Sequence, residues 1–125
     1  MRLSDEIRAR TKALALSVIS AYTALPRKVE VVAILGRQFV RAGTSIAAHT
    51  REASRARSDA EFLAKLELLL QEADETRLWA ELLMEGCGIT SEKLTVCHTE
   101  LGEILGIFTT MVVNTKRRTK PGTRN

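Results

Sequence analysis

Residues that interrupt helices are scarce in this chain and fall at only a few places. Pro26 is the only proline before the C-terminal tail, and the segment Gly86-Cys87-Gly88 carries two glycines. Ser58 begins an S-x-x-E segment, the capping-box pattern that starts a helix. These interruptions leave four long stretches, which we predict to be helices over residues 4–24, 29–51, 58–85 and 91–117. Because the connections are short, we expect an all-α, antiparallel up-down-up-down four-helix bundle over residues 1–117, followed by a basic flexible tail over residues 118–125.

The composition supports an all-α protein and argues against several other classes. Only 4% of the 125 residues are aromatic, too few for a typical β-sandwich or barrel, while 45% are hydrophobic, too many for a disordered chain. No apolar run approaches the ~20 residues of a membrane span, and the charged start of the sequence has no signal-peptide core. Two cysteines do not make a disulfide framework. We therefore expect a cytoplasmic protein without a membrane partner.

Two of the predicted helices carry the heptad pattern of a bundle helix. The pattern consists of Ile7, Thr11, Leu14, Val18, Ala21 and Leu25 in the first helix, and of Leu94, Cys97, Leu101, Ile104, Phe108 and Met111 in the last. Alternating spacings of three and four residues place these side chains on one face of each helix, as in helices that cross at ~20°. In the third helix, Trp79 is expected to be largely buried and to anchor that helix.

In the third predicted helix, apolar residues cover a wider arc than a single heptad-spaced row, or seam, would cover. Residues 62–70 read FLAKLELLL, with seven apolar residues among nine. A fully buried central helix would explain this run, but we favour a helix that also faces another subunit. We assign to this oligomer interface four residues of the third helix and two small residues of the second, which are Gly43, Ala47, Phe62, Leu63, Leu66 and Leu70.

Charge is distributed unevenly along the sequence. Seven basic residues lie between Arg27 and Arg57 against two glutamates, whereas eight acidic residues lie between Asp59 and Glu85 against two basic ones. Clustered lysine and arginine can bind the phosphates of nucleic acid, and without interleaved aromatic residues such binding should tolerate any sequence. For Arg41 and Arg51, ion pairing with carboxylates of the third helix is an alternative that stays open. The candidate nucleic-acid-binding residues are Arg37, Arg41, Arg51, Arg55, Arg57, Lys116, Arg117, Arg118, Lys120 and Arg124.

The predicted topology brings part of this set together. In an up-down-up-down bundle the second and fourth helices end at the same pole, so Arg55 and Arg57 should lie near the basic C-terminal segment. The helix dipole also favours cations at helix C-termini, which explains their position without any ligand. For the tail, a solvated segment without a binding role is an alternative that stays open.

No residue pattern points to catalysis or to a cofactor. His49 and His98 are the only histidines, and neither follows a glutamate by three positions, as di-iron bundles require. Cys87, Cys97 and His98 can meet near the turn between the third and fourth helices, but a structural zinc site takes four ligands. We predict a protein that is not an enzyme, with no catalytic residues, metal or cofactor.

One stretch of the sequence, from the second predicted helix into the third, resembles a known family. Residues 41–58 read RAGTSIAAHTREASRARS and continue into DAEFLAKLELLLQEADETRLWAELL. The chain resembles the four-helix-bundle family of the large-subunit ribosomal RNA intervening-sequence proteins over about residues 10–118, and is similar to the accessory variability-determinant proteins of diversity-generating retroelements. The resemblance implies a ring of five bundles with a basic surface. From the accessory proteins it also implies binding to nucleic acid and to a reverse transcriptase, and the family offers no catalytic residues to carry over.

Two function classes follow from these features. The first is a non-catalytic, ring-like homopentamer that binds DNA or RNA largely without sequence preference, with a reverse transcriptase as a further partner. The second is a structural or protein-interaction scaffold with no role in nucleic-acid binding. Binding that weakens steeply with salt would favour the first class.

Overall fold

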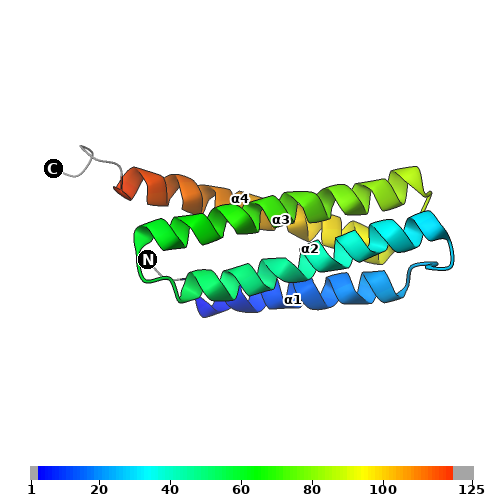
Figure 1. Cartoon of the computed structure of the whole chain (residues 1–125), viewed down its shortest axis with the longest axis horizontal. Coiled ribbons are helices and arrows are strands. Elements are labelled where there is room, and N and C mark those ends of the chain that lie inside the picture. The colour runs from blue at the N-terminus through cyan, green and yellow to red at the C-terminus, as the bar shows by residue number, and fades with distance from the viewer. Residues whose placement is uncertain (1–2, 120–125) are drawn as a thin grey trace.

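Four long helices make up the described part of the chain, residues 3–119, in the computed structural model (Figure 1). They are α1 (Asp5–Thr23), α2 (Glu30–Ser54), α3 (Asp59–Gly86) and α4 (Glu92–Thr119). The predicted all-α bundle is confirmed, and the largest boundary difference is at the end of α2, which runs to Ser54 instead of residue 51. Residues 118–119 of the predicted tail belong to α4, and the rest of that tail lies outside the described residues.

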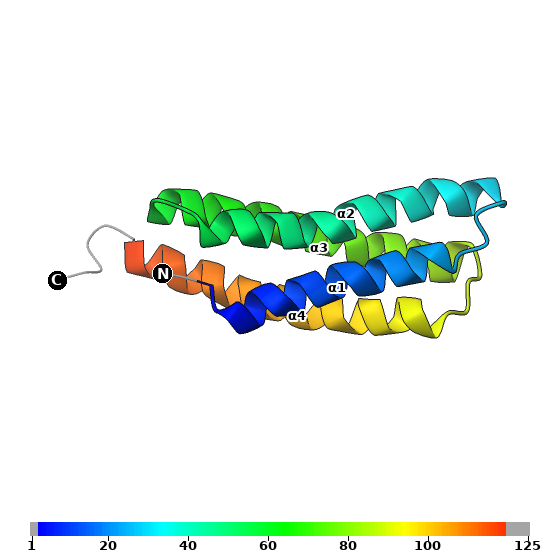
Figure 2. The ribbon, with the colours of Figure 1, turned by 90° about the horizontal axis from the view of Figure 1, so that it is seen from below.

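The helices form a square of antiparallel neighbours (Figures 1 and 2). α1 packs on α2 and α4, and α3 packs on the same two helices, so α1 and α3 are diagonal. The start of α1, the end of α2, the start of α3 and the end of α4 meet at one end of the bundle, drawn at the left of Figure 1. We call this end the terminal pole. The α1–α2 and α3–α4 connections lie at the other end, the distal pole.

Side-chain caps fix where three of the helices begin. Ser4, Ser58 and Ser91 each accept a hydrogen bond from the backbone N–H three residues on, at Oγ–N distances of 3.1, 3.1 and 3.2 Å. The cap predicted at Ser58 is confirmed with one difference. Glu61 accepts from the backbone N–H of Arg57, at 3.0 Å, whereas a standard capping box would use that of Ser58.

The core contains the predicted seams of α1 and α4, except that Ile7 of α1 is only partly buried and the seam of α4 shifts near its end. The buried residues are Thr11, Leu14, Val18 and Ala21 in α1, and Leu94, Cys97, Leu101, Ile104, Phe108, Val112 and Thr115 in α4. After Phe108 the buried row moves from Met111, which is only partly buried, to Val112. A helix with 3.6 residues per turn drifts away from a strict seven-residue repeat, and this drift explains the shift.

In α3, two of the residues predicted for the oligomer interface belong to the core of the same chain. The buried row of α3 consists of Phe62, Leu66, Leu69, Ala73, Thr76, Ala80 and Leu83, which we call the inner row. Phe62 and Leu66 are 3% and 0% exposed, so they cannot contact another subunit unless the bundle opens. Leu63 and Leu70 are partly buried beside the core, as is Ala47 of α2. The leucines that α3 exposes are instead Leu68, Leu78 and Leu82.

Gly43, also predicted for the oligomer interface, lies inside the bundle where three helices meet. A Cβ atom at this position would lie 2.7 Å from Cγ1 of Val18 in α1 and 3.2 Å from Cγ2 of Thr76 in α3. A larger residue would therefore force α1 away from α2, because the interior is close-packed. The role of Gly43 is corrected to packing within one chain, where it sets how closely α1 and α2 approach.

Trp79 is mostly buried, as predicted. Its indole is partly buried and packs against the core from the edge, whereas Leu66, Leu69 and Leu83 are fully buried. The indole Nε1–H has no hydrogen-bond partner among the described residues. The anchoring role of Trp79 in α3 stays a prediction.

By length and apolar composition alone, α4 is also suited to cross a membrane. Its buried residues, however, follow the spacing of a bundle seam, and the helix packs against α1 and α3. This placement is that of an amphipathic helix in a four-helix bundle.

Candidate nucleic-acid interface

A groove between α1 and α2 at the terminal pole gathers four cationic side chains. It has a volume of about 320 Å³, and its cations are Arg8 and Lys12 of α1, Arg51 of α2, and Arg55, the C-cap residue of α2. Each pair is spaced by four residues, so its members lie on one face of their helix. Antiparallel packing then places one pair beside the other across the groove. We call this the α1–α2 groove.

Most of the positive charge in the α1–α2 groove is not neutralised. Within residues 3–119, the side chains of Lys12, Arg51 and Arg55 make no hydrogen bond or ion pair, and no carboxylate lines the groove. Arg8 pairs with Asp5, an exposed residue in the first turn of α1. Four like charges around one groove repel one another, and a bound anion would relieve this repulsion.

Hydroxyl groups make up the rest of the polar lining of the α1–α2 groove. Thr11, Thr50 and Ser54 line it, and their hydroxyls donate to backbone carbonyls at 3.1, 2.8 and 3.0 Å. Because these protons are used within the helices, the groove offers no directed side-chain donor except its cations.

A second groove lies on the other side of α2, between α2 and α3. It has a volume of about 730 Å³, and we call it the α2–α3 groove. The cations that line it are Arg51, Arg55, Arg57 and Lys65. Arg51 and Arg55 therefore line both grooves, and the end of α2 forms a basic ridge between them.

Carboxylates partly neutralise the α2–α3 groove. Lys65 Nζ lies 3.1 Å from Oε1 of Glu52, and Arg57 Nη2 lies 3.8 Å from Oε2 of Glu61. Hydrogen bonds from Lys65 and His49 lower the pKa of Glu52, so this carboxyl stays ionised at neutral pH. The α2–α3 groove is therefore less positive than the α1–α2 groove.

The two other predicted arginines of α2 lie outside both grooves. Arg41 Nη1 and Nη2 lie 3.8 and 3.9 Å from carboxylate oxygens of Glu72 and Glu75 in α3. The ion-pairing alternative thus describes Arg41, whereas Arg51 has no carboxylate partner among residues 3–119. Arg37 is exposed and lies nearer the distal pole, away from the grooves.

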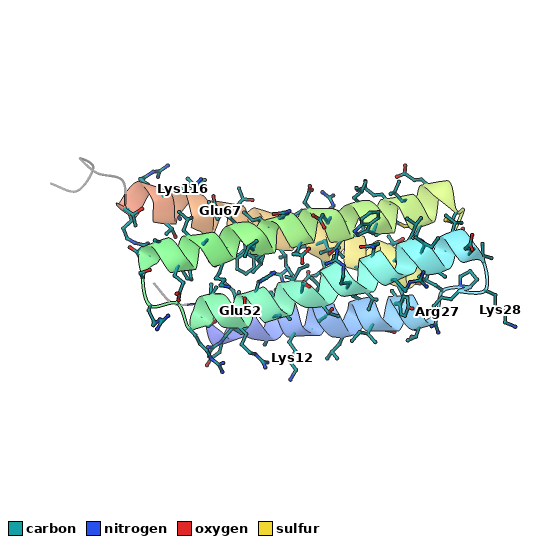
Figure 3. All side chains as sticks on the ribbon, viewed as in Figure 1. Lys12, Arg27, Lys28, Glu52, Glu67 and Lys116 are labelled. Atoms are coloured by element: carbon teal, nitrogen blue, oxygen red, sulfur yellow. The ribbon has the colours of Figure 1, made fainter. Side chains whose placement is uncertain are left out.

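The cations at the end of α4 lie on another side of the terminal pole and are paired. Lys116 Nζ lies 3.1 Å from Oε2 of Glu67, and Arg118 Nη2 lies 3.8 Å from Oδ1 of Asp59, both in α3. Figure 3 shows Lys116 and Glu67 at one edge of the bundle and Lys12 at the opposite edge. The end of α4 thus lies beside the turn that carries Arg57, as the topology predicted, but Lys116 and Arg118 face carboxylates of α3 and line neither groove.

The other three predicted cations lie at or beyond the end of α4. Arg117 is exposed in its last turn. Lys120 and Arg124 lie outside the described residues, so their assignment stays a prediction.

The sequence patterns did not single out three cations that line the grooves, which are Arg8, Lys12 and Lys65. Arg8 and Lys12 could have been proposed from the sequence, because they are four residues apart on a helix predicted to run antiparallel to α2. This spacing is not decisive, because Arg10 lies between them and faces α4. There its guanidinium donates to Glu100 and Glu103 at distances of 2.6 to 2.9 Å. Only the rotation of α1 within the bundle decides which of its cations reach the groove.

The residues considered for a metal site do not assemble into one. The described chain, residues 3–119, holds no group of three or more histidine, cysteine or acidic side chains placed to bind a metal ion. Cys97 is buried in the core, and burial raises the pKa of its thiol to about 11, so the thiol is protonated at neutral pH. His98 is engaged elsewhere, because its Nε2 lies 2.7 Å from Oε2 of Glu81.

The part of the chain that contains both grooves matches a known protein family. The 23S rRNA-intervening sequence protein family matches residues 5–110, which include every residue that lines the two grooves. The crystal structure of a protein of unknown function from the S23 ribosomal protein family of Bacteroides thetaiotaomicron has the same fold, with a TM-score of 0.76. It is 31% identical in sequence, over 85% of this chain and 97% of that one. No curated protein matches the chain.

Proposed function

The chain belongs to the 23S rRNA-intervening sequence protein family, and we propose that it is a non-catalytic, oligomeric adaptor that binds nucleic acid through the α1–α2 groove. The supporting observation is the set of four cations around this groove, three of them without a partner within residues 3–119. Such cations displace counterions from a phosphate backbone, which is the main source of sequence-independent affinity. The ridge formed by Arg51 and Arg55 extends the same surface into the α2–α3 groove.

The lining of the grooves supports binding to phosphates rather than to bases. Neither groove is lined by an aromatic side chain on which a base can stack. Contacts to phosphate position a nucleic acid but carry no sequence information directly. The proposed binding is therefore largely independent of sequence and common to DNA and RNA.

Self-association is the second part of the proposal, and a ring of five copies rests on the family resemblance alone. Repeated copies of one basic groove on a single polymer would gain affinity through avidity. Light scattering at micromolar concentration tests this directly, and a particle of 13.8 kDa would contradict it. A reverse transcriptase as a further partner likewise rests only on the resemblance to the retroelement accessory proteins.

A scaffold without a nucleic-acid role remains the second candidate, favoured by the exposed apolar side chains. Leu16, Val29 and Val96 are 59%, 52% and 54% exposed, and seven further large hydrophobic residues are at least 38% exposed. Surfaces of this kind contact other proteins. The two candidates differ in whether nucleic acid binds at all.

Fluorescence anisotropy with labelled duplex DNA and with structured RNA separates these candidates. The proposal expects the full chain to bind both, and to bind scrambled sequences equally well. It also expects the variant Arg51→Gln with Arg55→Gln to bind about tenfold more weakly at fixed salt. The matched control is Arg37→Gln with Arg41→Gln, which removes the same charge from the same helix outside the grooves. No binding at low salt would favour the scaffold, and an equal loss in both variants would place the site elsewhere.

A further inference from the structure

α3 carries a second regular row of residues, which faces away from the bundle. The row follows the inner row by two positions, or about 200° around the helix, and repeats its alternating spacing of four and three residues. It consists of Ala64, Leu68, Gln71, Glu75, Leu78, Leu82 and Glu85, and we call it the outer row. Leu68, Leu78 and Leu82 are 42%, 46% and 38% exposed, so three leucines of a heptad-spaced row lack a neighbouring helix.

The outer row is bordered by negative charge. No exposed position of α3 is a cation, but two of its carboxylates meet cations of neighbouring helices, because Glu67 pairs with Lys116 of α4 and Glu75 with Arg41 of α2. The exposed carboxylates Asp74 and Glu85 carry the remaining negative charge along α3. The two cations of α3 are both partly buried: Lys65 pairs with Glu52, and Arg77 lies against Gly102 of α4. Neither Asp74 nor Glu85 makes an ion pair within residues 3–119.

We propose that the outer row docks an α-helix of a partner protein that carries apolar residues at the same four-three spacing, flanked by lysine or arginine. Heptad-spaced leucines pack side chains from a facing helix in the manner of a coiled coil. Cations beside that seam would meet Asp74 and Glu85, and such complementarity selects the partner. α3 is diagonal to α1, so the docked helix leaves the α1–α2 groove free.

The charge on α3 also argues against a two-fold pairing of this face with itself. In a two-fold dimer the same patch lies on both sides of the interface. Two outer rows would then bring carboxylates of one copy against carboxylates of the other, with no exposed α3 cation to separate them. A partner with basic flanks removes this repulsion.

The test uses two synthetic helical peptides of about three heptads and the full-length chain. Both peptides carry leucines at the four-three spacing, one with lysines and the other with glutamates at the flanking positions. In titration calorimetry the lysine peptide should bind, and Leu78→Ser with Leu82→Ser should weaken it at least about tenfold. Asp74→Lys with Glu85→Lys should weaken the lysine peptide and strengthen the glutamate peptide. The matched control is Leu16→Ser, which removes a more exposed leucine from α1 and should change neither affinity.

Three results would overturn the proposal. Equal binding of the two peptides, or an equal loss in Leu16→Ser, would mean unspecific adsorption to apolar surface. Absence of peptide binding, together with a lower particle mass of the Leu78→Ser, Leu82→Ser variant in light scattering, would show that a second copy of the chain covers the outer row. Because the substituted side chains are exposed, thermal unfolding of each variant should match that of the original chain.

Discussion

The two sides of the terminal pole carry similar numbers of cations in opposite surroundings. On the side of α1 and α2, Lys12, Arg51 and Arg55 face a groove without a carboxylate. On the side of α4, each cation with a described contact has an acidic partner: Arg10 meets Glu100 and Glu103, Lys116 meets Glu67, and Arg118 meets Asp59. Paired cations stabilise the fold, whereas unpaired cations in one groove oppose it and are available to a phosphate.

The largest expected effect concerns the packing that brings α1 against α2. Gly43→Leu should lower the free energy of unfolding by about 3 kcal/mol, because a side chain at this position overlaps Val18. If the variant does not fold, Gly43→Ala adds the same Cβ in a milder form. The control is Gly106→Ala on α4, where nothing lies within 4 Å of an added Cβ and stability should rise by up to about 1 kcal/mol. Urea unfolding measures all three, and an unchanged Gly43→Leu would mean that α1 and α2 do not meet here.

Charge reversal in the α1–α2 groove should affect nucleic-acid binding, whereas charge reversal at the end of α4 should affect stability. Lys12→Glu should weaken binding to duplex DNA about tenfold while leaving stability unchanged or higher, because the introduced carboxylate lies among cations. Lys116→Glu should change binding little but lower stability by about 0.5 kcal/mol, because it meets Glu67. Anisotropy and thermal unfolding on both variants measure the two effects. The comparison fails if both variants lose affinity and stability in parallel.

Substitutions of Arg8 and Arg10, two positions apart in α1, should likewise differ in whether they affect binding or stability. Arg10→Gln removes a guanidinium that bridges to two glutamates of α4, whose hydrogen bonds raise its pKa, and should cost about 1 kcal/mol of stability. Arg8→Gln leaves those contacts intact and should instead weaken nucleic-acid binding. Unfolding and binding measured on this pair sharpen the comparison within one helix, and a stability loss in Arg8→Gln alone would reverse it.

The smallest effect concerns Glu52, the carboxylate that borders the α2–α3 groove. Hydrogen bonds from Lys65 and, to a smaller extent, from His49 lower the pKa of Glu52 in the folded protein. The ionised carboxylate therefore stabilises the fold at pH values above the ordinary glutamate pKa of about 4.3, and this stabilisation is lost as the pH falls through the lower pKa of the folded state. Glu52→Gln should therefore be less stable than the original chain at pH 7 by under about 0.5 kcal/mol. Unfolding between pH 7 and pH 3 should show this gap closing at the acidic end. A gap that widens on acidification would contradict the assignment.

The fold could be predicted because its determinants are local. Ser58 caps α3 through a contact three residues away, and the seams of α1 and α4 are visible as regular spacings. In α3 the same logic fails, because the run FLAKLELLL contains parts of two rows with identical spacing. The sequence of this run does not determine which of the two rows faces the core. Phe62 and Leu66 were therefore predicted to contact another subunit, and their burial inside the bundle excludes that contact.

The candidate site could be predicted only in part, because whether a cation is neutralised by a carboxylate depends on which helices face each other. Arg51, Arg55 and Arg57 were found from charge clustering, and the structure brings them together. Arg8 and Arg10 are two positions apart and equally basic, yet one lines a groove and the other meets two glutamates. The seam of α1 sets which face of the helix points inward, but whether α2 or α4 lies beside each flank of that seam follows from how the four helices pack.

The most direct test of the central claim is the salt dependence of duplex DNA binding in two matched double variants. Each unpaired cation that contacts a phosphate should contribute about 0.9 to the slope of log K against log salt concentration. Arg51→Gln with Arg55→Gln should therefore shallow the slope by about 1.8. Lys116→Gln with Arg118→Gln removes the same charge from the same pole and should leave the slope near its original value. Equal slopes in the two variants, or a larger change in the α4 variant, would contradict the assignment of the α1–α2 groove as the binding surface.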